Sequence, residues 1–197
     1  MWFRKKQSSP RAALKALLEA IEKPDLARMQ GLLNSHPSIA NQPHESGMTP
    51  LVYAIMRKHP AAVGLLLTTG ADPNRMQADG SFPLGVATLE GLEKIVSQLL
   101  EAGANPNQQD RFGSSALIYA SHHRRLAILS LILSKGGETE LRDMEGETAL
   151  MYAVSHRFKA GVIALLEAGA NRHARNFDSQ TAIDKAFDPE IAALLES

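Results

Sequence analysis

A repeat of 33 residues constrains this sequence more than any other feature, because one short motif returns at that interval with its apolar surroundings. In its first full copy the motif reads Gly47-Met48-Thr49-Pro50-Leu51. Its glycine, its leucine and a following alanine recur in register as Gly80, Gly113 and Gly146, as Leu84, Leu117 and Leu150, and as Ala54, Ala87, Ala120 and Ala153. A second motif, Gly70-Ala71-Asp72-Pro73-Asn74, returns at Gly103 and Gly169 and in altered form at Gly136. Such a period predicts one continuous array of small stacked units.

The two motifs together resemble the ankyrin repeat, with Gly-x-Thr-Pro-Leu near the start of a unit and Gly-Ala-Asp-x-Asn near its end. The resemblance implies an all-α fold, an ankyrin-repeat solenoid of stacked helix-turn-helix units with short hairpin-like loops. It predicts a flexible tail at 1–8 and a single domain at 9–197. That domain divides into an N-terminal cap repeat at 9–43, full repeats at 44–76, 77–109, 110–142 and 143–175, and a C-terminal cap at 176–197.

The family motif usually continues with a histidine, and that position holds other residues here. They are Val52, Gly85, Ile118 and Met151. The hydrogen bonds that the family histidine makes are therefore not expected in this chain.

Local signals agree with helices that start at the motif. Thr49 can accept a hydrogen bond from an amide of the first turn, and Pro50 stands where a missing N–H costs nothing. Ser115 and Thr148 offer the same cap, whereas Phe82 cannot, at a cost of about 1 kcal/mol unless Ser81 substitutes. A first helix of about nine residues would not persist alone in water, so neighbouring repeats must stabilise it.

Composition and charge exclude several classes of partner. The chain has 21 basic and 21 acidic residues and no cysteine, so it lacks the overall charge of a nucleic-acid binder and any disulfide framework. Its longest apolar runs, such as Leu126 to Leu133, are too short to cross a bilayer. The charged N-terminus has no apolar segment behind it, which predicts no signal peptide. We therefore expect a monomeric cytoplasmic protein that binds a protein, without nucleic acid or membrane insertion.

Motifs for catalysis, metals and cofactors fail on spacing. His44-Glu45 begins like a zinc-peptidase motif but lacks the second histidine, and Asp72-Pro73-Asn74 lacks the alternating ligands of a calcium loop. Gly113-Ser114-Ser115 is not a nucleophile elbow, and no phosphate-binding loop is found. We expect no enzyme activity and no cofactor.

Two charged clusters remain. His122-His123-Arg124-Arg125 stands where one helix turns into the next, and Lys58 and Arg157 occupy the same repeat position as Arg124. Opposite in sign are Glu138, Glu140, Asp143, Glu145 and Glu147 around one loop. Each cluster can be a solvated surface or part of a charge-complementary contact surface.

In ankyrin proteins the loop tips and first helices line a concave face that binds other proteins, and the resemblance implies the same here. Transferring the variable positions of the family residue by residue predicts these partner-binding residues: Met48, Met56, Arg57, Asp79, Leu89, Arg111, Phe112, His122, His123, Met144, Glu145, Glu147, His156 and Phe177. Arg111 and Phe112 are the expected anchors of the interface. Because histidine gains charge near neutral pH, affinity for an acidic partner should rise as the pH falls.

Two functional hypotheses follow from this surface and from the N-terminus. The first is a binding module that acts by protein contact. Its sharper version is a dedicated inhibitor or immunity protein, since we expect a chain without an attached effector domain to act by occupying its partner. The second is a membrane-associated adaptor that uses an aromatic and basic tail, formed by Trp2, Phe3, Arg4, Lys5 and Lys6.

Overall fold

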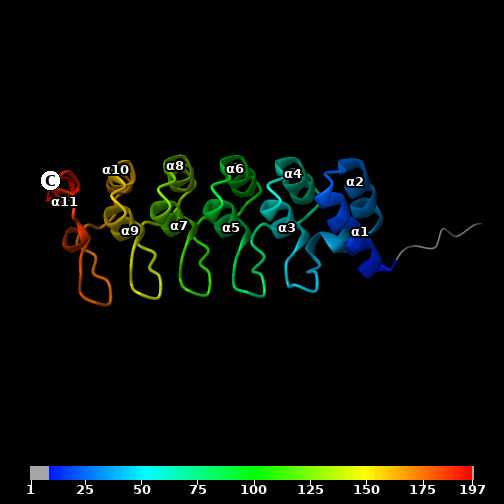
Figure 1. Ribbon diagram of the computed structural model, residues 1–197, viewed down its shortest axis with the longest axis horizontal. Coiled ribbons are helices and arrows are strands. Elements are labelled where there is room, and N and C mark those ends of the chain that lie inside the picture. The colour runs from blue at the N-terminus through cyan, green and yellow to red at the C-terminus, as the bar shows by residue number, and fades with distance from the viewer. Residues whose placement is uncertain (1–8, 197) are drawn as a thin grey trace, which may run out of the picture.

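The computed structural model describes residues 9–196, in which helices stack in pairs along one extended array (Figure 1). The predicted tail at 1–8, with its aromatic and basic residues, lies outside the described residues. One row contains α3 (Pro50–Met56), α5 (Pro83–Leu89), α7 (Ala116–His122) and α9 (Ala149–Ser155), and the next contains α4 (Pro60–Thr68), α6 (Glu93–Glu101), α8 (Leu126–Ser134) and α10 (Lys159–Glu167).

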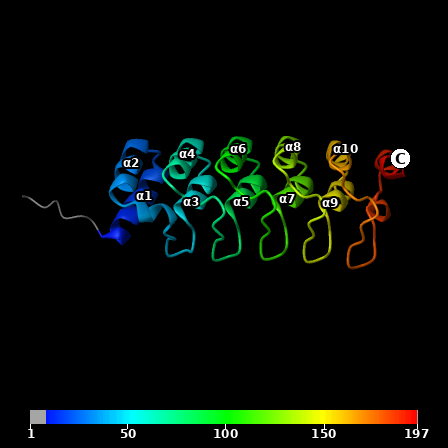
Figure 2. The same ribbon diagram turned by 180° about the vertical axis from the view of Figure 1, so that it is seen from behind.

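The ends of the array are built from other elements. The N-terminal end consists of α1 (Pro10–Glu22), α2 (Leu26–Ser35) and the 3-10 helix η1 (Pro37–Asn41). The C-terminal end consists of η2 (Ile183–Lys185) and α11 (Pro189–Glu196). Hairpin loops, here called fingers, project beside the row of α3 to α9, as both views show (Figures 1 and 2). The predicted helical solenoid is confirmed, and within residues 9–196 the only β-pairing is an isolated bridge between Gln109 and Ser115.

The helix caps follow the sequence prediction. The Thr49, Ser115 and Thr148 hydroxyls accept hydrogen bonds from backbone amides three residues on, at 3.4, 3.3 and 3.4 Å. Phe82 makes no such bond, and Ser81 does not replace it, because its hydroxyl donates to Asp79. The first helices are seven residues long rather than about nine, which makes them still more dependent on their neighbours.

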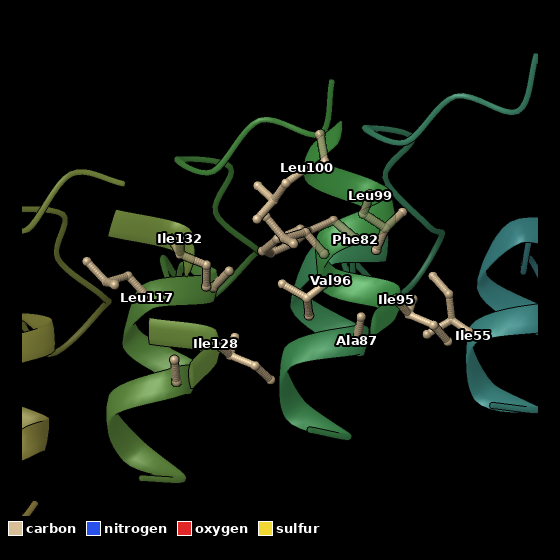
Figure 3. Packing of buried hydrophobic residues seen from close by; sticks show 14 of the residues in the cluster. Ile55, Phe82, Ala87, Ile95, Val96, Leu99, Leu100, Leu117, Ile128 and Ile132 are labelled. Atoms are coloured by element: carbon tan, nitrogen blue, oxygen red, sulfur yellow. The ribbon is translucent and has the colours of Figure 1, made fainter. Parts of the chain in front are cut away.

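Phe82 instead fills core space that a helix residue fills in the other repeats (Figure 3). Its ring is fully buried over Gly85, where a Cβ would lie only 2.8 Å from Cζ of the ring. The equivalent positions carry large buried side chains, namely Val52, Ile118 and Met151. In this repeat the large buried side chain belongs to the N-cap residue and not to the helix. Burial of its ring offsets the free energy lost with the capping hydrogen bond.

The core is a seam that runs the length of the array between the helix rows. Ala54, Ala87, Ala120 and Ala153 are completely buried, because their small side chains let each first helix lie close to the next. Leu117 and Ile128 continue the seam in the middle of the chain (Figure 3). α7 packs against both α5 and α9, so each repeat completes the core of its neighbours.

Each first helix ends in a left-handed turn. The residues in that conformation are Lys58 (φ 57°), Gly91 (φ 68°), Arg124 (φ 56°) and Arg157 (φ 52°). Only glycine adopts it without a steric cost, so Gly91 is the residue that local backbone energetics favour. The step of 33 residues aligns Gly91 with the three cations, and that alignment would have predicted the turn.

Asparagine side chains tie each repeat to the exit loop of the next. The amide of Asn41 donates to Gly70 O at 2.7 Å and accepts from the Asp72 N–H at 2.7 Å. Asn74 and Asn107 repeat this clamp one and two units later. Glu140 stands at the next equivalent position, where it accepts from the Asn171 N–H at 2.8 Å. An ionised carboxylate has no proton to donate, so the clamp loses its bond to the carbonyl of Gly169.

Changing Glu140 to Asn should therefore stabilise the protein, because it supplies the missing donor to Gly169. We expect the free energy of unfolding in urea to rise by about 0.5–1.5 kcal/mol. The reverse change, Asn107→Glu, removes a donor from the same clamp and should lower it by a similar amount. An E140N protein no more stable than the parent, beside a destabilised N107E protein, would contradict this account.

Candidate functional site

The fingers of the third and fourth full repeats are held by an aspartate and a tyrosine. Asp143 accepts hydrogen bonds from the N–H groups of Glu145 at 2.9 Å and Glu147 at 3.0 Å, and from the Tyr152 hydroxyl at 2.7 Å. Asp110 holds its own finger and Tyr119 in the same way. Burial, together with the neighbouring aspartate, raises the pKa of each tyrosine, so both hydroxyls stay protonated and remain donors. Each finger is thus fixed to its first helix.

Successive fingers in this half of the array are also bonded to one another. The Met144 N–H donates to Phe112 O at 2.8 Å, and the Phe177 N–H donates to Glu145 O at 3.1 Å. Gly113 permits the close approach, since a Cβ there would lie 2.9 Å from the Cα of Asp143. The fingers at 110–115, 143–148 and 176–181 therefore form one connected surface, here called the finger face.

Large apolar side chains project from the finger face into solvent. Phe112, Met144 and Phe177 are 56%, 65% and 73% exposed, although loops are normally polar. The guanidinium of Arg111 lies over the Phe112 ring, with Cζ 5.3 Å from the ring centroid. The structure thus brings together four of the residues that the sequence predicted as partner contacts.

The predicted histidines gather beside Tyr152 at the ends of α7 and α9. The His122 ring centroid lies 4.3 Å from that of His156, 4.7 Å from that of His123 and 5.4 Å from that of Tyr152. Because Tyr152 also bonds Asp143, one chain of contacts joins the finger to the histidines. Burial lowers the pKa of His122, and the charges of His156 and His123 lower it further. No group of three or more potential metal ligands occurs among residues 9–196.

The other predicted contacts lie towards the N-terminal end or beside the finger face. Met56 and Leu89 are exposed at the ends of α3 and α5, and Met48 is half-buried in its finger. Arg57 is paired with Glu22 at 2.8 Å. Asp79 accepts hydrogen bonds from Ser81, which hold the pKa of its carboxyl below the usual range. Glu145 is exposed on the finger face.

Glu147 does not fit its predicted role. Its side chain is only 8% exposed, because it accepts a hydrogen bond from the Asn176 amide at 2.7 Å and pairs with Lys185 at 2.6 Å. Asp143, from the same predicted acidic cluster, is buried by its bonds to the finger and Tyr152. The negative surface is therefore smaller than the sequence indicated, since two of its carboxylates hold the finger together.

A cavity at the N-terminal end was not predicted. It has a volume of about 580 Å³, lies between α1 and the first finger, and is lined in part by Lys15, Leu18, Glu22, Met48 and Tyr53. It forms where α1, which is longer than the other first helices, lies beside α3. No motif marks these residues, and only the unusual length of the α1 pattern could have suggested a different surface here.

Comparisons with known proteins agree with this geometry. A family model described as ankyrin repeats in three copies matches residues 17–110 and 84–176. The crystal structure of EF0377, an ankyrin repeat protein, is similar with a TM-score of 0.85 and 28% identity, covering 93% of this chain and 98% of that one. An ankyrin repeat domain from Acinetobacter baumannii AYE has a TM-score of 0.85 and 26% identity, over 91% of this chain and 95% of that one.

Curated relatives match over a shorter stretch. The NAD-capped RNA hydrolase NUDT12 of Homo sapiens and that of Macaca fascicularis are each 42% identical over 48 residues, which is 24% of this chain and 10% of each relative. This chain therefore matches only a small part of those proteins. In the described residues, no helix is long and apolar enough to pass through a bilayer.

Acidification should destabilise the fold through His122. Its pKa in the folded protein lies below the ordinary value of 6.5, so the unfolded chain binds the proton more readily. The stability it contributes is present above that value and is lost as the pH falls towards the folded pKa. We expect the urea midpoint to fall more between about pH 7.5 and 5.5 in the parent than in a His122→Gln variant.

The control for this pH series is His173→Gln, which removes an exposed histidine outside the cluster. Equal pH dependence of the parent and the His122→Gln protein would contradict the assignment of this effect to His122.

Proposed function

Because the chain belongs to the ankyrin-repeat family, we propose that it binds a partner protein through its finger face and first helices. Ankyrin repeats are generally protein-protein interaction modules and typically act as non-catalytic scaffolds. Fold alone does not assign a partner, so the proposal depends on the surface that this chain presents.

One observation carries the proposal: exposed apolar side chains stand on fingers that are already bonded together. Phe112, Met144 and Phe177 offer apolar area to a partner, and Met144 and Phe177 are linked by their backbones to the preceding finger. A surface that is ordered before binding loses less conformational entropy when the partner arrives. Burial of a few large anchors of this kind supplies most of the energy in protein interfaces.

Arg111 and the histidines add polar specificity to this apolar row. Arg111 lies over the Phe112 ring, so a partner that covers the ring also meets a cation. His122, His123 and His156 lie at the far end of the same first helices, reached through Tyr152. An acidic partner group there would favour the protonated histidines, which supports tighter binding of such a partner at lower pH.

Within this binding function, we propose more specifically that the protein is an inhibitor or immunity protein that acts as a cytoplasmic monomer. In this role its finger face covers the active site of an enzyme or toxin. Affinity capture from a lysate of the source organism, followed by an activity assay on the captured protein, tests it. Full activity of a captured enzyme in the complex would leave a scaffold role instead.

Phe112→Ala should weaken binding of the captured partner by about 2 kcal/mol or more, roughly 30-fold, if the ring is a central anchor. Arg111→Ala should weaken it less. Phe187→Ala is the matched control, because Phe187 is even more exposed than Phe112 but lies outside the fingers, after η2.

Circular dichroism should confirm that the three variants keep the helical fold, and titration calorimetry gives their affinities. Unchanged affinity of the Phe112→Ala protein, or an equal loss in the Phe187→Ala protein, would place the contact elsewhere on the molecule.

A further inference from the structure

We propose that the turns between α7 and α8 and between α9 and α10 form a second contact surface, which binds an acidic polypeptide segment. This surface, here called the basic edge, consists of Arg124, Arg125 and Arg157. It goes beyond the finger face, and it shares with the proposed function only the premise that the partner is a protein.

Backbone strain is the first observation. Arg124 and Arg157 adopt a left-handed conformation with φ of 56° and 52°, at the position that Gly91 fills without strain in the preceding repeat. A side chain there costs on the order of 1 kcal/mol. The exposed guanidinium groups make no hydrogen bond or ion pair in the described residues that would offset this cost. Backbone strain that no contact within the protein offsets points to a role in binding another molecule.

A missing carboxylate is the second observation. Lys58, at the equivalent position, pairs with Glu90 of the following repeat at 3.0 Å. Glu90 lies 32 residues after Lys58, and the same step from Arg124 leads to His156, so a histidine stands where the balancing carboxylate would be. His123 occupies that position in the intervening repeat. The array therefore neutralises its cation near the N-terminal end and leaves the cations of the basic edge without an acidic partner within residues 9–196.

Spacing indicates what the partner looks like. Equivalent residues of stacked helices lie roughly 8–10 Å apart, which sets the distance between Arg124 and Arg157. A polyproline II helix rises about 3.1 Å per residue and has three residues per turn, so carboxylates three residues apart lie on one face and match that distance. The planar guanidinium suits a carboxylate, which it binds with two parallel hydrogen bonds.

A polypeptide fits this surface better than a nucleic acid. The basic edge spans only two repeats, and Glu93 is exposed on the repeat before it. A nucleic acid backbone would continue across that negative charge, whereas a short acidic segment would end before it.

The test uses a labelled peptide with glutamate at every third position in a glycine and serine background, titrated into ¹⁵N-labelled protein at low ionic strength. We expect chemical shifts to move at residues 122–125 and 156–158 but not at 56–59. The double variant Arg124→Asn and Arg157→Asn should weaken binding by about tenfold, since exposed charge pairs contribute modestly. Asparagine tolerates the left-handed turn, which keeps the fold intact.

Lys58→Asn is the matched control, because it removes a cation at the same backbone position whose charge Glu90 already balances. It should change the affinity less than twofold. His156→Glu supplies the second variant: it rebuilds the Lys58–Glu90 pairing for Arg124 and should weaken peptide binding without loss of helical signal.

Equal binding by the double variant and the parent would overturn the proposal, as would an equal loss in Lys58→Asn. Tighter binding of a single-stranded oligonucleotide of the same charge would assign the edge to nucleic acid instead. A failure here leaves the finger face untouched, because that surface is tested with the captured partner and with Phe112→Ala.

Discussion

No repeat of this chain can bury its own apolar face, and the rest of the structure depends on that limitation. A first helix of seven residues is too short to be stable alone. Each one packs against the corresponding element of the repeat on either side, and its alanine is completely buried. Stability is therefore a property of interfaces between neighbours, and the two ends of the array need elements of a different kind.

Hydrogen bonds reinforce the same dependence on neighbours. The asparagine clamp joins a side chain of one repeat to the backbone of the next, and the finger bonds from Met144 and Phe177 do likewise. Glu147 shows the consequence for function, because Asn176 and Lys185 of the following unit bind its carboxylate and bury it. In such an array, contacts from the next repeat determine whether a side chain is exposed to a partner.

The fold and the caps could be predicted because they follow from short-range rules: Thr49 and Pro50 are residues that favour the N-cap and the first position of a helix. Phe112, Met144 and Phe177 could also be predicted as exposed, since they occupy loop positions. The burial of Glu147 and the cavity beside α1 could not, because each depends on contacts between residues about 30 apart in sequence. Arg124 and Arg157 could be predicted in part. Their alignment with Gly91 indicated a left-handed backbone, but nothing in the sequence indicated that they lack a carboxylate partner.

The Phe82 ring fills the space above Gly85, so the side chains at these two positions can change only together. A larger residue at 85 would overfill the space that the ring occupies, and a smaller residue at 82 would leave it empty. Either single step passes through a less stable protein, although both end states are well packed. This repeat can therefore acquire the packing of its neighbours only by two coordinated substitutions. That requirement explains how one unit of a regular array can keep a packing arrangement that the other units lack.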